Sequence, residues 1–153
     1  MNTIAGIPAH PLLVHGIVVL GPLTALLAVL CALWPAARAR LVWLTVALAA
    51  AVLVLTPLTT SAGSWLAGQQ KSVSPVLAEH FELGSTFIYY AVALLVIALL
   101  IAGLHRYSGR LGDRRPIAGI FVAALTIVVS VLTVWAVVRI GDTGADAVWG
   151  MSQ

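Results

Sequence analysis

The chain has 153 residues, of which 61% are hydrophobic and only 8% are charged, and its mean hydropathy is +1.08. Soluble domains carry about 25% charged residues. A soluble chain of 16.0 kDa would also leave too much surface exposed to hide this many apolar side chains from water. These numbers exclude a soluble enzyme, a disordered protein and a disulfide-stapled secreted module. The sequence therefore predicts an integral membrane protein, with one transmembrane domain over residues 1–153.

Four apolar stretches are long enough to cross a bilayer, which takes about 20 helical residues. Pro11, Pro75 and Pro116 stand at expected helix starts, where a helix tolerates the missing N–H group. Because the connections are short, we expect an up-down-up-down arrangement. The predicted fold is an all-α, integral membrane four-helix bundle. Its helices are expected at residues 11–34, 41–66, 75–104 (with the membrane part from about 86) and 116–140.

The basic residues indicate the orientation of this bundle. Six of the eight basic residues lie in the connections between helices 1 and 2 and between helices 3 and 4, and the positive-inside rule places such connections in the cytoplasm. We therefore expect both termini on the non-cytoplasmic side of a bacterial cytoplasmic membrane. The arginines are better explained as topology signals and lipid contacts than as a nucleic-acid site. The six residues are Arg38, Arg40, Arg106, Arg110, Arg114 and Arg115.

Three histidines and one aspartate are expected at the outer face of the bundle. His10 and His15 stand at the start of the first helix. His80 stands at the start of the third helix, and Asp142 follows the fourth. Ionisable groups at such positions are candidates for function, because burying them is costly. His15 would lie about 6 Å into its helix and His80 about 7.5 Å into its own, so we expect these two imidazoles to face each other. His105 should lie at the opposite membrane face.

The sequence resembles a known family at several positions. The opening GIPAHPLLVH (residues 6–15), His80 and the Gly141 to Gly144 spacing near the chain's end are similar to the bacterial DUF2231 membrane proteins. The resemblance covers nearly the whole chain and implies four spans. Some similar proteins are fused to Rieske-type iron–sulfur domains, which implies a connection with electron transfer by analogy. The family pattern has histidine after the first of these glycines, where this chain has Asp142.

Two kinds of ligand fit the outer-face residues. A b-type haem could be held by His15 and His80 as axial ligands, since neutral imidazoles and a dry four-helix core suit that cofactor. The protein would then act in electron transfer, together with a redox partner. Alternatively, His10, His15, His80 and Asp142 could bind zinc or copper, because three imidazoles and a carboxylate match the preferences of these metals.

A third hypothesis needs no ligand. The chain could be a non-catalytic membrane subunit of a larger complex, whose histidines only tie the helix starts together. Its single cysteine, Cys31, excludes an iron–sulfur cluster or a disulfide within one chain. No nucleophile elbow, phosphate-binding loop or HExxH motif is present. The sequence therefore predicts no catalytic residues, and an electron-transfer or accessory role is favoured over catalysis.

Overall fold

The computed structural model describes residues 3–4, 6–69, 74–107, 109 and 115–150. Four long helices and one short antiparallel strand pair make up the regular structure of these residues. The two strands are joined through Gly6, whose φ of 82° is a conformation that glycine adopts without strain. The elements are β1 (Thr3–Ile4), β2 (Ile7–Pro8), α1 (Ala9–Leu33), α2 (Pro35–Ala67), α3 (Pro75–Arg106) and α4 (Arg115–Trp149).

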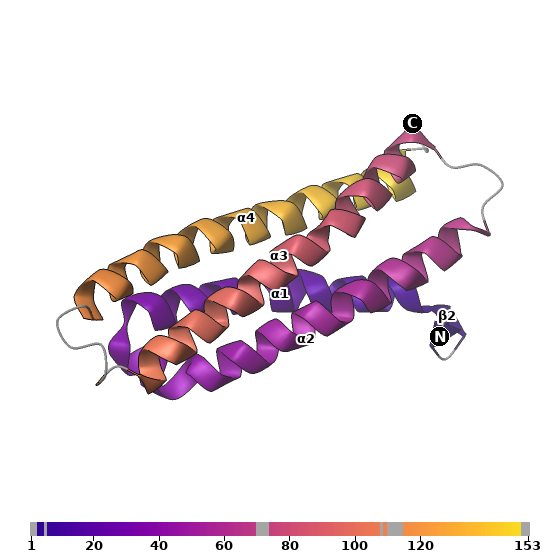
Figure 1. Cartoon of the computed structure of the whole chain (residues 1–153). Coiled ribbons are helices and arrows are strands. Elements are labelled where there is room, and N and C mark those ends of the chain that lie inside the picture. Colours follow the sequence, from indigo (N-terminus) through magenta and orange to yellow (C-terminus); the bar gives the residue numbers. More distant parts are fainter. Residues whose placement is uncertain (1–2, 5, 70–73, 108, 110–114, 151–153) are drawn as a thin grey trace.

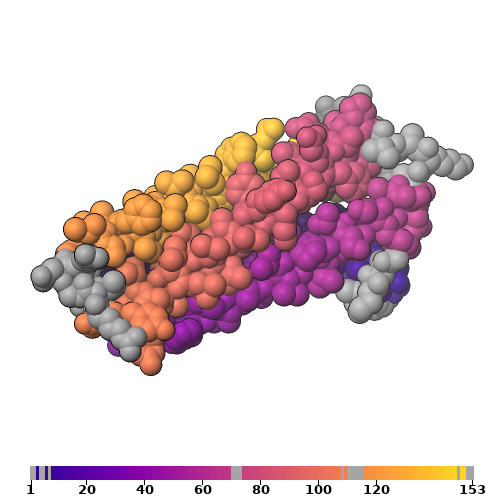
Figure 2. Space-filling model, viewed as in Figure 1, coloured from indigo at the N-terminus to yellow at the C-terminus, as the bar shows by residue number. Residues whose placement is uncertain are grey.

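The helices run alternately in opposite directions, so that α1 and α3 begin at the same end of the bundle where α2 and α4 finish (Figure 1). Each helix packs against its two neighbours in the cyclic order α1, α2, α3, α4, and α1 also meets α3 across the diagonal. Figure 2 shows α3 and α4 side by side along one face of the elongated molecule. The predicted all-α, up-down-up-down four-helix bundle is confirmed.

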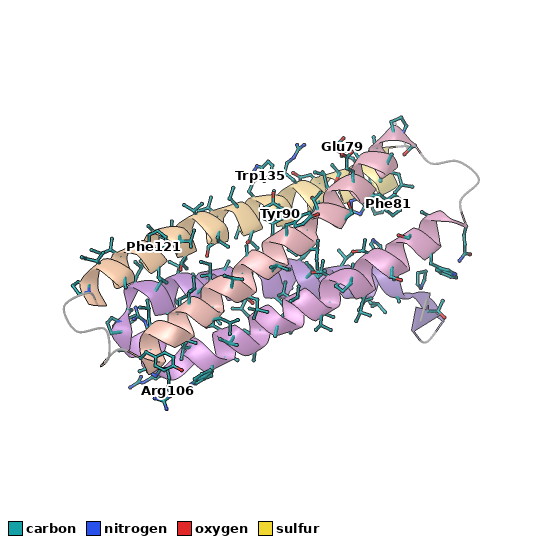
Figure 3. The ribbon with its side chains drawn as sticks, viewed as in Figure 1. Glu79, Phe81, Tyr90, Arg106, Phe121 and Trp135 are labelled. Carbon is teal, nitrogen blue, oxygen red and sulfur yellow. The ribbon has the colours of Figure 1, made fainter. Side chains whose placement is uncertain are left out.

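All four helices are long and apolar enough to cross a membrane. Large apolar side chains project outward, among them Phe121 and Trp135 of α4, which are 66% and 54% exposed (Figure 3). The interior is filled by alanines, threonines and a few larger residues such as Leu94. Small side chains inside and large apolar ones outside are the pattern of helices that pack closely within lipid.

The buried threonines satisfy their hydroxyl groups locally. Each donates a hydrogen bond to the carbonyl oxygen one turn earlier in its own helix, as Thr126 does to Val122 at 2.6 Å. Ser130 differs, because its hydroxyl donates to the Ala25 carbonyl of α1 at 3.2 Å and so joins α4 to α1. Within the part of the chain that the structure describes, the interior therefore holds polar side-chain atoms without leaving them unpaired, as a low-dielectric environment requires.

The connection between α1 and α2 is shorter than the sequence indicated. Only Trp34 lies between them, and α2 begins at Pro35, earlier than the expected residue 41. Arg38 is thus part of a helix and not of a loop. Its Nε and Nη2 atoms donate to the carbonyl oxygens of Cys31 and Ala32, each at 2.7 Å. Arg38 therefore pairs carbonyls that the last turn of α1 leaves without a helical partner.

Helix α4 also differs from its expected length. It continues to Trp149, beyond the expected residue 140, so Asp142 lies within the helix and does not follow it. At the other end of the bundle, Arg110 and Arg114 fall outside the described residues. The side of the membrane on which each connection lies therefore stays a prediction from the charge pattern.

Candidate ligand site

Two histidines meet across the diagonal of the bundle, at the end where α1 and α3 begin. His10 is the second residue of α1, and His80 is in the second turn of α3. Both side chains are half-buried. Their ring centroids lie 6.2 Å apart, and the ring planes are nearly perpendicular at 89°. Two titratable side chains that are 70 positions apart in the chain are thus brought into one contact.

Each ring is tied to a neighbouring helix through its Nδ1 atom. His10 Nδ1 donates to the Thr59 carbonyl of α2 at 2.9 Å. His80 Nδ1 donates to the Ile140 carbonyl of α4 at 3.1 Å, and the Thr143 hydroxyl lies 3.3 Å from the same atom. A carbonyl oxygen can only accept, so Nδ1 carries the hydrogen in both rings. In a neutral imidazole the lone pair then belongs to Nε2.

The Nε2 atoms take no part in these helix contacts. No described residue forms a hydrogen bond with Nε2 of His10 or His80. Among the described residues, every side-chain nitrogen or oxygen that is fully buried has a partner. The two Nε2 atoms therefore reach open space. Both histidines line a cavity of about 60 Å³, which is more than the roughly 10–15 Å³ that a single water molecule needs.

All four helices contribute to the wall of this cavity, and most of the wall is apolar. The hydroxyl groups of Thr56 and Thr60 point to carbonyls of their own helix at 2.8 Å. These hydroxyls thus use their hydrogens and keep only neutral oxygen lone pairs, so the imidazoles are the stronger transition-metal ligands in this wall. The lining residues are His10, Val14, Ile17, Val18, Thr56, Thr59, Thr60, Gly63, His80, Phe81, Gly84, Phe87, Val137 and Ile140.

Comparison with known proteins adds one assignment. Residues 6–152 match the family described as "Predicted membrane protein (DUF2231)". The chain belongs to the DUF2231 family. No curated protein and no solved structure matches it. The sequence-based resemblance is thereby confirmed, and the whole histidine pair of this DUF2231 protein lies within the matched range.

The other site residues expected from the sequence lie elsewhere in the DUF2231 protein. The His15 side chain is exposed, and its Nδ1 donates to the Pro11 carbonyl of its own helix. The expectation that His15 faces His80 is therefore not met, because His10 occupies that position. His105 lies in the last turn of α3, at the far end of the helix from His80.

The four residues that were expected to bind zinc or copper together do not come together either. Asp142 is exposed on α4 and does not line the cavity. Among the described residues there is no group of three or more His, Cys, Asp or Glu side chains that could share a metal ion. What the structure brings together is a pair of imidazoles, His10 and His80.

The sequence-based reasoning did not identify the backbone features that hold these rings. The carbonyls of Thr59 and Ile140 accept the Nδ1 hydrogens, and Gly63 and Gly144 lie directly against the two rings. A carbonyl acceptor carries no residue-type signal, so it could not be found from the sequence. The glycines were visible as small residues near helix ends, although nothing connected them with the histidines.

Proposed function

We propose that this small four-span membrane protein of the DUF2231 family binds a transition metal between His10 and His80, as a single ion or as the iron of a haem, and acts in electron transfer. The observation that carries the proposal is the shared arrangement of the two rings. Each imidazole is fixed through Nδ1 to a main-chain carbonyl, which leaves its Nε2 lone pair unused, and both rings line one cavity.

This arrangement is the one that metal-binding histidines use. A ligating imidazole usually donates its other N–H group to a carbonyl or carboxylate, which fixes the tautomer and the ring orientation. Imidazole nitrogen suits copper, zinc, iron and nickel. A purely structural histidine needs only one hydrogen bond of this kind and no second ring opposite.

The spacing of the rings agrees with one shared ion. Metal–imidazole bonds are about 2 Å long, and a ring centre lies about 1 Å behind its nitrogen, so two rings on opposite sides of one ion have centroids roughly 6 Å apart. The His10 and His80 centroids are 6.2 Å apart. The perpendicular ring planes are compatible with this geometry, because rotation about a metal–nitrogen bond leaves the distance unchanged.

The cavity has room for an ion between the two rings. Its volume of about 60 Å³ accommodates a metal ion, with space for a water molecule as a further ligand. With the orientation expected from the arginines, the site would lie toward the non-cytoplasmic face.

Spectroscopy and metal analysis of the detergent-purified protein test the proposal. We expect about one metal per chain in the wild type, its loss in His10→Ala and His80→Ala, and its retention in His15→Ala and His105→Ala. A sharp α band after dithionite reduction would identify haem, and copper without that band would identify an ion. Zinc would support the site and overturn the electron-transfer role. Absence of metal and haem from every preparation, even after reconstitution, would favour the non-catalytic subunit instead.

A further inference from the structure

Each histidine of the pair lies against a glycine of the helix that accepts its hydrogen bond. A Cβ atom on Gly63 would lie 2.8 Å from His10 Nδ1 and 2.9 Å from His10 Cε1. A Cβ atom on Gly144 would lie 3.0 Å from His80 Cε1 and 3.3 Å from its Nδ1. Distances this short mean that either ring would have to move if its glycine carried a side chain.

The two contacts are built in the same way. Thr59, which accepts from His10, stands four residues before Gly63, and Ile140, which accepts from His80, stands four residues before Gly144. Residues four apart lie on one face of a helix. A glycine on that face leaves the carbonyl of the preceding turn uncovered, and this oxygen has a second lone pair for the imidazole.

The equivalence extends to the helices themselves. His10 and Gly63 belong to the consecutive helices α1 and α2, and His80 and Gly144 to the consecutive helices α3 and α4. In both halves the histidine is near the start of the first helix and the glycine is near the end of the second. The cavity thus lies between two similar half-sites, each of which supplies one ring.

We infer that Gly63 and Gly144 are positioning residues of the ligand site, which set the depth of the two imidazoles and direct both Nε2 atoms to one point between the half-sites. This inference rests on the proposed function, because it concerns how the same site holds its metal. It also specifies the coordination: one ion on the line between two equivalent nitrogens, with any further ligand coming from water or from a haem.

A general need for small residues where helices pack does not explain why these two positions are glycine, because alanine would also meet it. Alanine is the better helix former, and it is the commonest residue among those buried in this interior. Gly84 also lines the cavity, yet a Cβ atom there would meet nothing within 4 Å. The close approach of an imidazole is therefore what distinguishes Gly63 and Gly144 from their neighbour in the same wall.

The test uses titration of the metal-free, detergent-purified protein with copper(I) and, separately, with haemin. We expect Gly63→Ala and Gly144→Ala each to weaken binding about 10- to 100-fold, the usual effect of disturbing the groups that orient a metal ligand. Gly141→Ala is the matched control, since it adds the same methyl group to the end of α4 at a glycine that does not line the cavity and has nothing within 4 Å of its Cβ position, and it should bind within about twofold of the wild type.

A double-mutant comparison separates the ring contact from a folding defect. Gly63→Ala should lower the melting temperature of the metal-free protein, but it should not lower it further when His10→Ala has removed the ring. The pair Gly144→Ala and His80→Ala should behave alike. Equal melting losses with and without the ring would overturn the inference.

The two proposals fail in different ways. If Gly63→Ala and Gly144→Ala bind as tightly as the wild type while His10→Ala and His80→Ala do not bind, the positioning role is wrong and the metal site stands. If His10→Ala and His80→Ala still bind with unchanged affinity, the metal site between them is wrong, whatever the glycine variants do.

Discussion

Arg38 allows a test of what stabilises the contact between α1 and α2. Substitution by lysine keeps its charge but changes its hydrogen bonds, so the two contributions can be measured apart. The charge contributes to the expected positive-inside bias. The guanidinium also donates from Nε to the Cys31 carbonyl and from Nη2 to the Ala32 carbonyl, each at 2.7 Å. These carbonyls end α1, where Trp34 alone separates it from α2. Lysine at this position would keep the charge and lose the two-pronged donor geometry.

The expected loss follows from these two contacts. A hydrogen bond with a charged donor contributes about 1.5–3 kcal/mol, and the partial exposure of Arg38 places each bond near the lower end because water or lipid head groups can replace it. Arg38→Ala should therefore lower the free energy of unfolding by about 2–4 kcal/mol. Arg38→Lys can satisfy one carbonyl and should lose about 1–2 kcal/mol.

Equilibrium unfolding in mixed detergent micelles, followed by circular dichroism, measures these differences. Arg40 is the matched control, because it is an exposed arginine on the same turn of α2. Both Arg40→Ala and Arg40→Lys should stay within about 0.5 kcal/mol of the wild type. If Arg38→Lys is as stable as the wild type, or if Arg40→Ala is as destabilised as Arg38→Ala, then charge alone explains the residue and the capping argument is wrong.

Three further outcomes are expected. Leu94→Ala should cost about 2–5 kcal/mol of unfolding free energy, because Leu94 is fully buried and the truncation leaves a cavity; a loss below 1 kcal/mol would contradict tight packing there. Ser130→Ala should cost about 1 kcal/mol by removing the bond from α4 to Ala25, and Ser130→Thr, which keeps the hydroxyl, should retain the bond; an unchanged stability of Ser130→Ala would contradict a role for the interhelical bond. A C-terminal alkaline phosphatase fusion should be active and a green fluorescent protein fusion dark; the reverse would overturn the orientation.

The bundle could be predicted from the sequence because a lipid bilayer restricts the backbone structures that can cross it. Helices must satisfy their own backbone groups within the bilayer, so four long apolar stretches already specify four helices. Their ends were harder to predict, since hydropathy locates the apolar part of a helix and not its last hydrogen bond. Residues 35–40 contain two arginines, which is why they were expected in a connection, yet Pro35 at the first helical position starts α2 there.

The histidine pair lies at the end of the bundle where the sequence placed it, but two residues expected beside it, His15 and Asp142, are exposed and do not line the cavity. His10 and His80 were both placed at the end of the bundle that holds them, but His15 was expected opposite His80. His15 was chosen because its expected depth in the helix matches that of His80, and because a residue before a proline, such as His10, is usually extended. In the structure α1 begins at Ala9, so His10 is helical. Five helical steps turn the chain by roughly 140° beyond a full turn, so only one of the two histidines can face inward, and α1 is apolar on every side.

The remaining question is why imidazoles should hold the helix starts together when simpler side chains would do. One donor per helix pair is all that the Thr59 and Ile140 carbonyls use, so the second nitrogen of each ring is not needed to tie the helices together. His10 and His80 nevertheless bring two such nitrogens to the lining of one cavity. An ion between the rings would use both lone pairs, and so would a water molecule that donates to both. The pair thus has more ligand capacity than a structural tie requires, which is the strongest physical reason to look for a bound ligand at this position.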